Sequence, residues 1–169
     1  EKGRLDDPAV SVLYAEGEIS EQGDGITADL ARQLRDLRSE DDVKAVVLRI
    51  NSPGGSAFLS EQIWHEVKSL RATGRKVVVS MGDVAASGGY YIASAADAIV
   101  ASPMTLTGSI GIFGMLSDAS ELAKRFGLNV DVVQTSRYAD MDASNFFGFS
   151  LRPLTPEQRA LIQHQVERG

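Results

Sequence analysis

A serine followed by two glycines is the part of this sequence with the clearest chemistry. Ser87 stands within GDVAASGGYY, residues 82–91, directly after a run of apolar residues typical of a buried strand. At a strand-to-helix turn a serine presents its hydroxyl at the positive end of the helix, and glycines leave the backbone amides open to a substrate. The nucleophile pattern G-x-S-x-G is matched only in part, because Ala85 stands where the first glycine would be. The run predicts a nucleophilic serine, or else small residues that let a helix pack closely on a sheet.

A second glycine-rich turn reads NSPGGS and covers residues 51–56. It follows another strand-like run at its carboxyl end, which is where α/β folds place their ligands. Pro53 fixes one backbone angle, and Gly54 and Gly55 can adopt conformations that direct an amide into a pocket. An ordinary tight turn would use the same residues.

The two turns together favour acyl transfer. This reaction requires a nucleophile, a proton acceptor and amide donors directed at the developing oxyanion. Ser87 would attack, and the amides of Gly88 and Gly54 would stabilise the negative charge. Gly55 and Gly89 are expected to border the substrate pocket. Two glycine turns at neighbouring strand ends are much more specific than either turn alone.

Strands and helices that alternate along the chain position these turns. Strands are predicted at residues 9–15, 43–50, 76–81, 98–101 and 130–133, and helices after the N-caps Thr27 and Ser60, after Ser87, at residues 117–126 and after Thr155. Such an order implies parallel crossovers and an α/β domain. Trp64 is expected in the core and His65 in solvent. Residues 106–111 are expected to form a loop, and residues 134–154, too long for an ordinary connector, a functional or partner-contacting segment.

The composition excludes several classes of protein. A chain of 169 residues with 43% hydrophobic residues suits one domain with its own core. The net charge of -6 argues against a nucleic-acid partner, and the absence of cysteine excludes disulfides, a thiol nucleophile and thiolate metal sites. The sequence has no apolar run long enough to span a membrane and no leader peptide, so this segment is expected to be soluble. Both ends are expected to be cuts in a longer chain.

Three motifs together resemble the bacterial signal peptide peptidase (SppA) family of serine proteases. They are NSPGGS, VVVSMGDVAASGGYYIASAAD and TLTGSIGIFG, and the similarity covers about residues 9–140. The resemblance implies a Clp-protease or crotonase type of fold, which is a spiral of ββα units with a mostly parallel sheet, in a single protease domain over residues 1–169. It also implies a serine and lysine dyad, with Ser87 as the nucleophile, Gly54 and Gly88 in the oxyanion hole and Ser109 orienting the lysine. No cofactor and no metal are expected.

The chain departs from the family at the proton acceptor. Related Clp-type proteases use a histidine beyond the serine, but no histidine lies between His65 and His164. A lysine serves as a base only if its environment lowers its pKa from about 10.4. Short family members carry that lysine in a segment that aligns with residues 136–141, where this chain has Ala139 instead. The nearby Arg137 cannot give up its proton.

The resemblance to the long members of the family explains this departure. Long members contain two homologous halves, with the serine in the carboxyl-terminal half and the lysine in the amino-terminal half. We therefore expect this chain to be the serine-bearing half, inactive alone, from a protein anchored in the bacterial inner membrane with its catalytic domain on the periplasmic side. Long members form bowl-shaped tetramers and cleave released signal peptides and other unfolded apolar segments. Two alternatives remain, a catalytically incomplete scaffold half of an oligomeric protease and a crotonase-like acyl-CoA enzyme.

Overall fold

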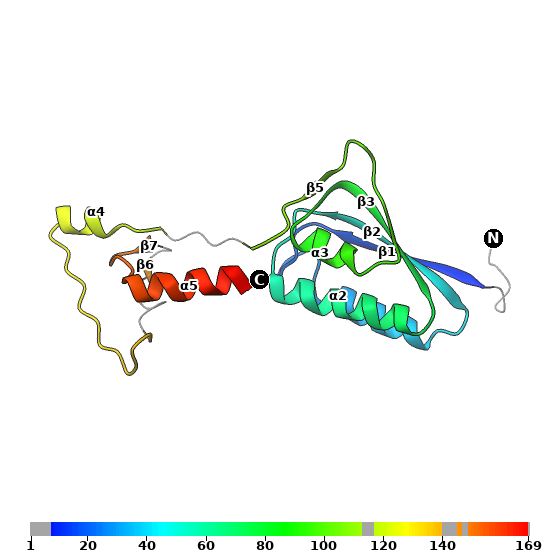
Figure 1. Cartoon of the computed structure of the whole chain (residues 1–169), viewed down its shortest axis with the longest axis horizontal. Coiled ribbons are helices and arrows are strands. Elements are labelled where there is room, and N and C mark those ends of the chain that lie inside the picture. The colour runs from blue at the N-terminus through cyan, green and yellow to red at the C-terminus, as the bar shows by residue number, and fades with distance from the viewer. Residues whose placement is uncertain (1–7, 113–116, 140–144, 147–148, 169) are drawn as a thin grey trace. The chain divides into compact units, whose positions relative to one another are not determined.

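The computed structural model describes residues 8–112, 117–139, 145–146 and 149–168. The chain divides into two compact units, Glu1–Gly111 and Ile112–Gly169, and each unit is described by itself (Figure 1). The first unit contains both glycine turns and Ser87. The prediction that the whole chain makes one protease domain stays a prediction.

A parallel sheet forms the centre of the first unit. Its five strands are β1 (Ala9–Glu16), β2 (Val43–Ser52), β3 (Lys76–Ala86), β4 (Ala98–Val100) and β5 (Leu106–Gly108). The order is β1-β2-β3-β4, and β5 pairs with the carboxyl end of β3. All of these pairings are parallel, which confirms the predicted α/β class with a mostly parallel sheet.

Helices connect the first four strands of this sheet. They are α1 (Ala28–Asp36) with the short 3-10 helix η1 (Leu37–Ser39), α2 (Ala57–Ala72) and α3 (Gly88–Ser94). Thr27 caps α1 as predicted, and its hydroxyl accepts a hydrogen bond from the Asp29 amide at 3.3 Å. The cap of α2 is Ser56 and not the predicted Ser60. The helix begins one turn earlier because the Ser56 hydroxyl already accepts from a first-turn amide, which leaves Ser60 buried inside that turn.

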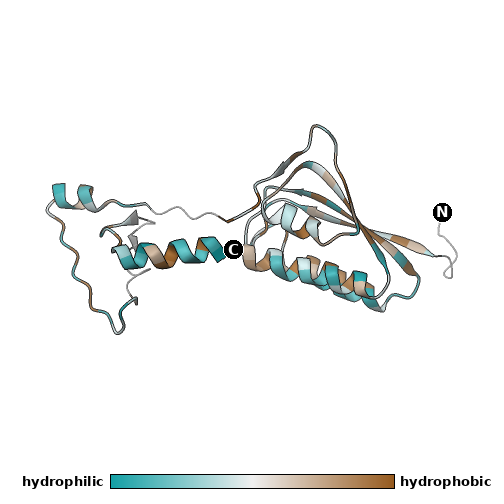
Figure 2. Cartoon of the chain, in the orientation of Figure 1, coloured by the Kyte–Doolittle hydropathy of each residue, from teal (hydrophilic) through white to brown (hydrophobic). Residues whose placement is uncertain are grey.

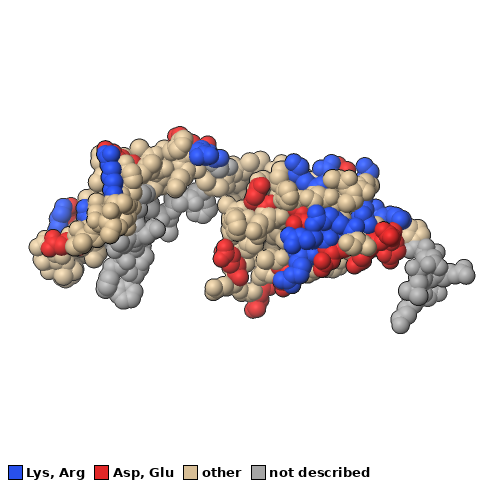
Figure 3. Space-filling model, turned by 90° about the horizontal axis from the view of Figure 1, so that it is seen from below, with Lys and Arg blue, Asp and Glu red and all other residues tan. Residues whose placement is uncertain are grey.

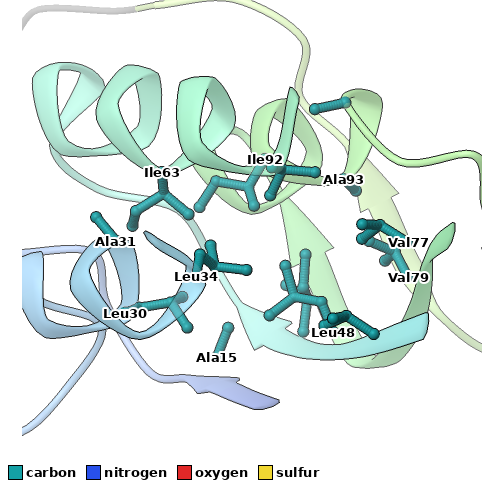
Figure 4. Packing of buried hydrophobic residues seen from close by; sticks show 14 of the residues in the cluster. Ala15, Leu30, Ala31, Leu34, Leu48, Ile63, Val77, Val79, Ile92 and Ala93 are labelled. Carbon is teal, nitrogen blue, oxygen red and sulfur yellow. The ribbon is translucent and has the colours of Figure 1, made fainter. Parts of the chain in front are cut away.

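The core lies between the sheet and the helices that cover one of its faces (Figure 4). Alternate side chains of β2 point into it, and Val46, Leu48 and Ile50 are completely buried. Leu34 of α1 and Ile63 of α2 meet them from the helix side, also without exposure. Each such side chain contributes about 2 kcal/mol through burial alone. Figure 2 shows hydrophobic residues concentrated in the strands, while hydrophilic and hydrophobic residues alternate along α2.

Charged residues gather on the outer side of the helices (Figure 3). Glu66 of α2, which is 6% exposed, accepts from the Arg35 guanidinium of α1 at 2.7 Å and pairs with Arg38 at 2.9 Å. Burial of a carboxylate is tolerated only with such partners. This cluster therefore fixes α1 against α2. His65, the neighbour of Glu66 in α2, is exposed to solvent, as predicted.

The second unit contains α4 (Ser120–Arg125), β6 (Asn145–Phe146), β7 (Phe149–Ser150) and α5 (Pro156–Arg168). The predicted helix at residues 117–126 is therefore shorter than expected. The predicted capping box of α5 is confirmed, because Thr155 and Gln158 exchange hydrogen bonds of 3.0 and 3.2 Å. Residues 140–144 and 147–148 of the predicted partner-contacting segment lie outside the described residues, and its role stays a prediction.

The predicted strand at residues 130–133 is wrong, because these residues have irregular structure. No described strand pairs with them, and Val133 is completely exposed. An apolar run alone cannot make a strand when a hydrogen-bonding neighbour is missing. Among the helices of the described ranges, none has both the length and the apolar character needed to cross a membrane.

Candidate active site

Ser87 lies at the junction of β3 and α3, as the sequence predicts. The strand continues past its predicted end at Met81 to Ala86, and Ser87 is the N-cap of α3. Its backbone has φ 51° and ψ -121°, a region that residues other than glycine rarely adopt. Such strain persists only where the surroundings impose it, and it is frequent at active sites. The half-buried Ser87 is therefore held in a specific orientation by its neighbours.

A bulge in the pairing of β2 with β3 lies just before Ser87. The register shifts between the pairs Ile50–Met81 and Ser52–Ala85, so that β3 carries extra residues. The Asn51 side chain lies against these extra residues, and its carbonyl oxygen accepts a hydrogen bond from the backbone amide of Val84 at 3.1 Å. Without this bulge β3 would reach α3 in another orientation. Asn51 is thus a site residue whose role the sequence analysis did not identify.

The two predicted glycine turns meet at Ser87. Gly54 has φ 100°, and a Cβ added to it would lie 2.7 Å from the Ser87 Cβ and 2.8 Å from the Gly88 nitrogen. Only a glycine permits this approach. The structure therefore brings together the three residues to which the sequence assigned nucleophile and oxyanion roles. The Gly54 amide, however, donates to the buried hydroxyl of Ser52 at 3.1 Å and already has an acceptor in this conformation.

The other glycines of the turns allow close packing. A Cβ at Gly88 would lie 2.3 Å from the Ser60 hydroxyl, and one at Gly89 would lie 3.1 Å from the Ser52 carbonyl oxygen. At Gly55 it would lie 2.1 Å from the Ile19 carbonyl oxygen. The packing role considered from the sequence is therefore real for these glycines, and it exists beside any catalytic role.

Ile19 is a second residue that the sequence analysis missed. Its amide donates to the Gly54 carbonyl at 2.8 Å, and its carbonyl accepts from the Ser56 amide at 2.7 Å. The side chain is 1% exposed. These two hydrogen bonds hold the NSPGGS turn at Gly54 and at Ser56. The only local signal was an isolated apolar residue in a glycine-rich stretch that was expected to lack regular structure.

Ser109 directly follows Gly108, which is hydrogen-bonded to Ser87. The Ser87 amide donates to the carbonyl of Gly108 at 3.0 Å, and Ser109 has the positive φ of 50°. The loop predicted at residues 106–111 is therefore partly a strand, because β5 pairs with the end of β3. This pairing places the backbone of Ser109 beside the nucleophile, while its role toward a lysine stays a prediction.

Tyr91 ties the helix that follows Ser87 to α2. Its hydroxyl donates to the Glu61 carboxylate, and this bond raises the pKa of the Tyr91 hydroxyl above its ordinary value. The ring stacks on Trp64 with 5.7 Å between the centroids, and the Tyr91 amide donates to the Ser87 carbonyl at 2.9 Å. Trp64, predicted in the core, is half-buried at its edge.

Each lysine that the structure describes contacts a partner other than Ser87. Lys44 donates to the Asp41 carbonyl, Lys68 lies over the Trp64 ring, Lys76 pairs with Asp97 and Lys124 pairs with Glu121. The bond to Glu121 raises the pKa of Lys124, the opposite of what a base requires. Lys2 lies outside the described residues. Within the described ranges, no cluster of three or more His, Cys, Asp or Glu side chains could hold a metal ion.

The family of the chain follows from a match to a family model. The model of peptidase family S49 matches residues 69–169, a segment that contains both Ser87 and Ser109. This chain belongs to peptidase family S49. The resemblance to the SppA proteases that the motifs indicated is thereby confirmed.

Relatives of this S49 chain are much longer than the chain itself. It is 44% identical over 164 residues to Protease 4 of Salmonella typhi, which is 95% of this chain and 25% of that protein. It is 39% identical over 160 residues to the chloroplastic serine protease SPPA of Arabidopsis thaliana, which is 94% of this chain and 23% of that protein. The chain thus spans about a quarter of the length of these relatives.

A solved structure shares the fold of this S49 chain. The 1510-N membrane-bound stomatin-specific protease, in complex with a substrate peptide, superimposes with a TM-score of 0.55 at 23% identity. The match covers 66% of this chain and 49% of that chain. This likeness supports the predicted fold class, together with the parallel sheet.

Proposed function

We propose that this chain is the nucleophile-bearing domain of a serine endopeptidase that works through an acyl-enzyme. The observation that carries the proposal is the backbone of Ser87, which holds a φ of 51° against Gly54 and Gly88 at the end of β3. The Ser87 Oγ forms a bond to the scissile carbonyl carbon while its proton passes to a base. The C–N bond then breaks, the amine leaves with a proton, and water hydrolyses the ester.

Two backbone amides stabilise the oxyanion in this proposal. Gly88 is the first residue of α3, so its amide lies beside the nucleophile at a strand end. The Gly54 amide is the second donor, and the oxyanion must replace the Ser52 hydroxyl as its acceptor. A hydrogen bond to a charged acceptor is stronger than one to a neutral hydroxyl, which favours the exchange as charge develops.

The proposed base is a lysine from outside this chain. The described lysines have other partners, and Ala139 stands where short relatives carry the lysine. An amino-terminal half of the full-length protein would supply the amine, and Ser109 would orient it. The chain spans about a quarter of the length of its relatives, which leaves room for such a half in the full-length protein.

The proposed setting is a homo-oligomer, a tetramer of two-half chains, on the periplasmic side of the bacterial inner membrane. The proposed substrates are cleaved signal peptides and other unfolded apolar segments. Exposed apolar side chains on the neighbouring segment support this class, because Leu106 and Ile110 lie two residues before and after Gly108, whose carbonyl accepts from the Ser87 amide. Similarity to proteins named Protease 4 and SPPA favours a protease over an acyl-CoA enzyme.

A peptide library should be cleaved by the full-length protein mainly beside apolar or small residues. The reason is the exposed apolar side chains of Leu106 and Ile110 on the segment that contacts Ser87, in a chain whose net charge of -6 repels acidic substrates. Sequencing of the cleavage products gives the preference. Cleavage mainly beside aspartate or glutamate would contradict the proposed substrate class.

A fluorophosphonate probe should label the full-length protein on Ser87, because the probe reacts with an activated serine hydroxyl. Mass spectrometry of the peptide that contains residues 82–91 locates the label. The second candidate function is that of a catalytically incomplete scaffold half. It is favoured by the absence of a lysine partner for Ser87 among the described residues. A scaffold half would assemble without taking up the probe.

The matched variants Gly54→Ala and Gly74→Ala sharpen this test. Both glycines have positive φ, 100° and 89°, but an added Cβ strikes Ser87 and Gly88 at the first position and meets no atom within 4 Å at the second. Gly54→Ala should lower the labelling rate about 100-fold, because the reacting group is displaced. Gly74→Ala carries the same backbone strain and should be labelled like the wild type. Equal labelling of both variants would contradict the proposed site.

A further inference from the structure

The segment that carries Gly108 and Ser109 is held to β3 by hydrogen bonds and not by packing. No side chain of residues 101–111 is buried, and Met104 and Leu106 are 88% and 67% exposed. The parallel pairing of β5 with β3 includes only three residue pairs. Since little apolar surface is buried here, each remaining hydrogen bond has a large share in fixing the position of β5.

A threonine hydroxyl supplies one of these bonds close to the nucleophile. The Oγ1 of Thr107 donates to the Ala85 carbonyl at 2.7 Å, two residues before Ser87. Thr105 makes a similar bond of 2.8 Å to the Gly82 carbonyl, further along β3. The residue after Thr107 is Gly108, whose carbonyl accepts from the Ser87 amide at 3.0 Å. Thr107 thus stands one residue from a direct contact with the strained backbone.

We propose that Thr107 is a positioning residue for Ser87, an inference that rests on the proposed function. Its hydroxyl fixes β5 against β3 and so holds the Gly108 carbonyl where it accepts from the Ser87 amide. A residue with φ 51° keeps this conformation only while such contacts impose it. When the Thr107 hydroxyl is lost, β5 moves more freely, and Ser87 spends less time in the reactive orientation.

The variants Thr107→Val and Thr107→Ser test this role in the full-length protein. Valine keeps the shape of the side chain and removes the hydroxyl, so kcat should fall about tenfold with KM nearly unchanged. Serine keeps the hydroxyl and should restore most of kcat. Thr73→Val is the matched control, because the Thr73 hydroxyl makes the same kind of bond, to the Leu70 carbonyl at 2.6 Å, at the far end of α2. It should retain the wild-type kcat.

Hydrogen exchange gives a second readout that does not depend on activity. The Ser87 amide should exchange faster in Thr107→Val than in the wild type, and at the wild-type rate in Thr107→Ser and Thr73→Val. Unchanged exchange at Ser87, or a fall in kcat that serine does not rescue, would overturn the positioning role. Failure of the proposed function has another signature, a wild-type protein in which Ser87 takes up no fluorophosphonate while Thr107→Val still accelerates exchange.

Discussion

The Ser87→Ala variant of the full-length protein should lose its peptidase activity and keep its fold. The substitution removes the only oxygen that can form the acyl-enzyme in the proposed site, and loss of a serine nucleophile lowers turnover by about 10⁴-fold or more. It deletes one hydroxyl from a half-buried side chain and creates no cavity of note. We therefore expect the free energy of unfolding to change by less than about 1 kcal/mol.

Cleavage of an unfolded apolar protein measures the activity, and thermal unfolding followed by circular dichroism measures the stability. Ser69→Ala is a suitable control, since it removes the same hydroxyl near the carboxyl end of α2. That variant should cleave like the wild type. Turnover by Ser87→Ala at the wild-type rate would show that another residue is the nucleophile.

The sequence was sufficient to predict most elements of the first unit and the place of Ser87, because these depend on local patterns. Alternating buried side chains in β2 and the apolar run of β3 reflect strands in a core, and the glycines around Ser87 reflect a turn with little room. The meeting of Gly54 with Ser87 could be inferred as well, since parallel neighbours bring their carboxyl ends to one edge of a sheet.

The parts that the sequence did not reveal depend on contacts between distant segments. Nothing local to Asn51 indicates that its side chain fills a bulge in β3, and nothing local to Ile19 indicates that its backbone brackets the NSPGGS turn. Ser52 is a similar case, since its hydroxyl accepts the hydrogen bond of the Gly54 amide, which the sequence analysis assigned to the oxyanion. These residues act through backbone groups whose partners lie elsewhere in the chain.

Two predictions of local structure were wrong for the same reason: a strand was found where a loop was predicted, and irregular structure where a strand was predicted. Residues 106–108 pair with β3 although their sequence contains a glycine and a serine follows, because the end of β3 offers free hydrogen-bonding groups. Residues 130–133 have a better strand composition but no described strand beside them. The available neighbour, and not the intrinsic preference of the residues, decided both cases.

This chain alone should be nearly inactive and should gain activity when the amino-terminal half of its full-length protein is added. A base must lie within hydrogen-bond reach of the Ser87 hydroxyl and must be unprotonated near neutral pH. The described lysines are committed elsewhere, to a carbonyl, an aromatic ring and two carboxylates. The bond to Glu121 raises the pKa of Lys124, so that lysine stays protonated near neutral pH. We expect the added half to raise cleavage of an unfolded apolar protein by about 10²-fold or more, the usual contribution of a general base.

The test compares the purified chain with and without that half, and uses the half with its lysines replaced one at a time. Loss of the gain on replacement of a single lysine in the added half would identify the base. A pH profile supports the assignment, because activity should rise with pH through the lowered pKa of that lysine, as the amine loses its proton. The outcome that contradicts the proposal is robust cleavage by this chain alone that disappears when one of its own five lysines is replaced. The base would then lie inside the chain, and the division of the dyad between two halves would be wrong.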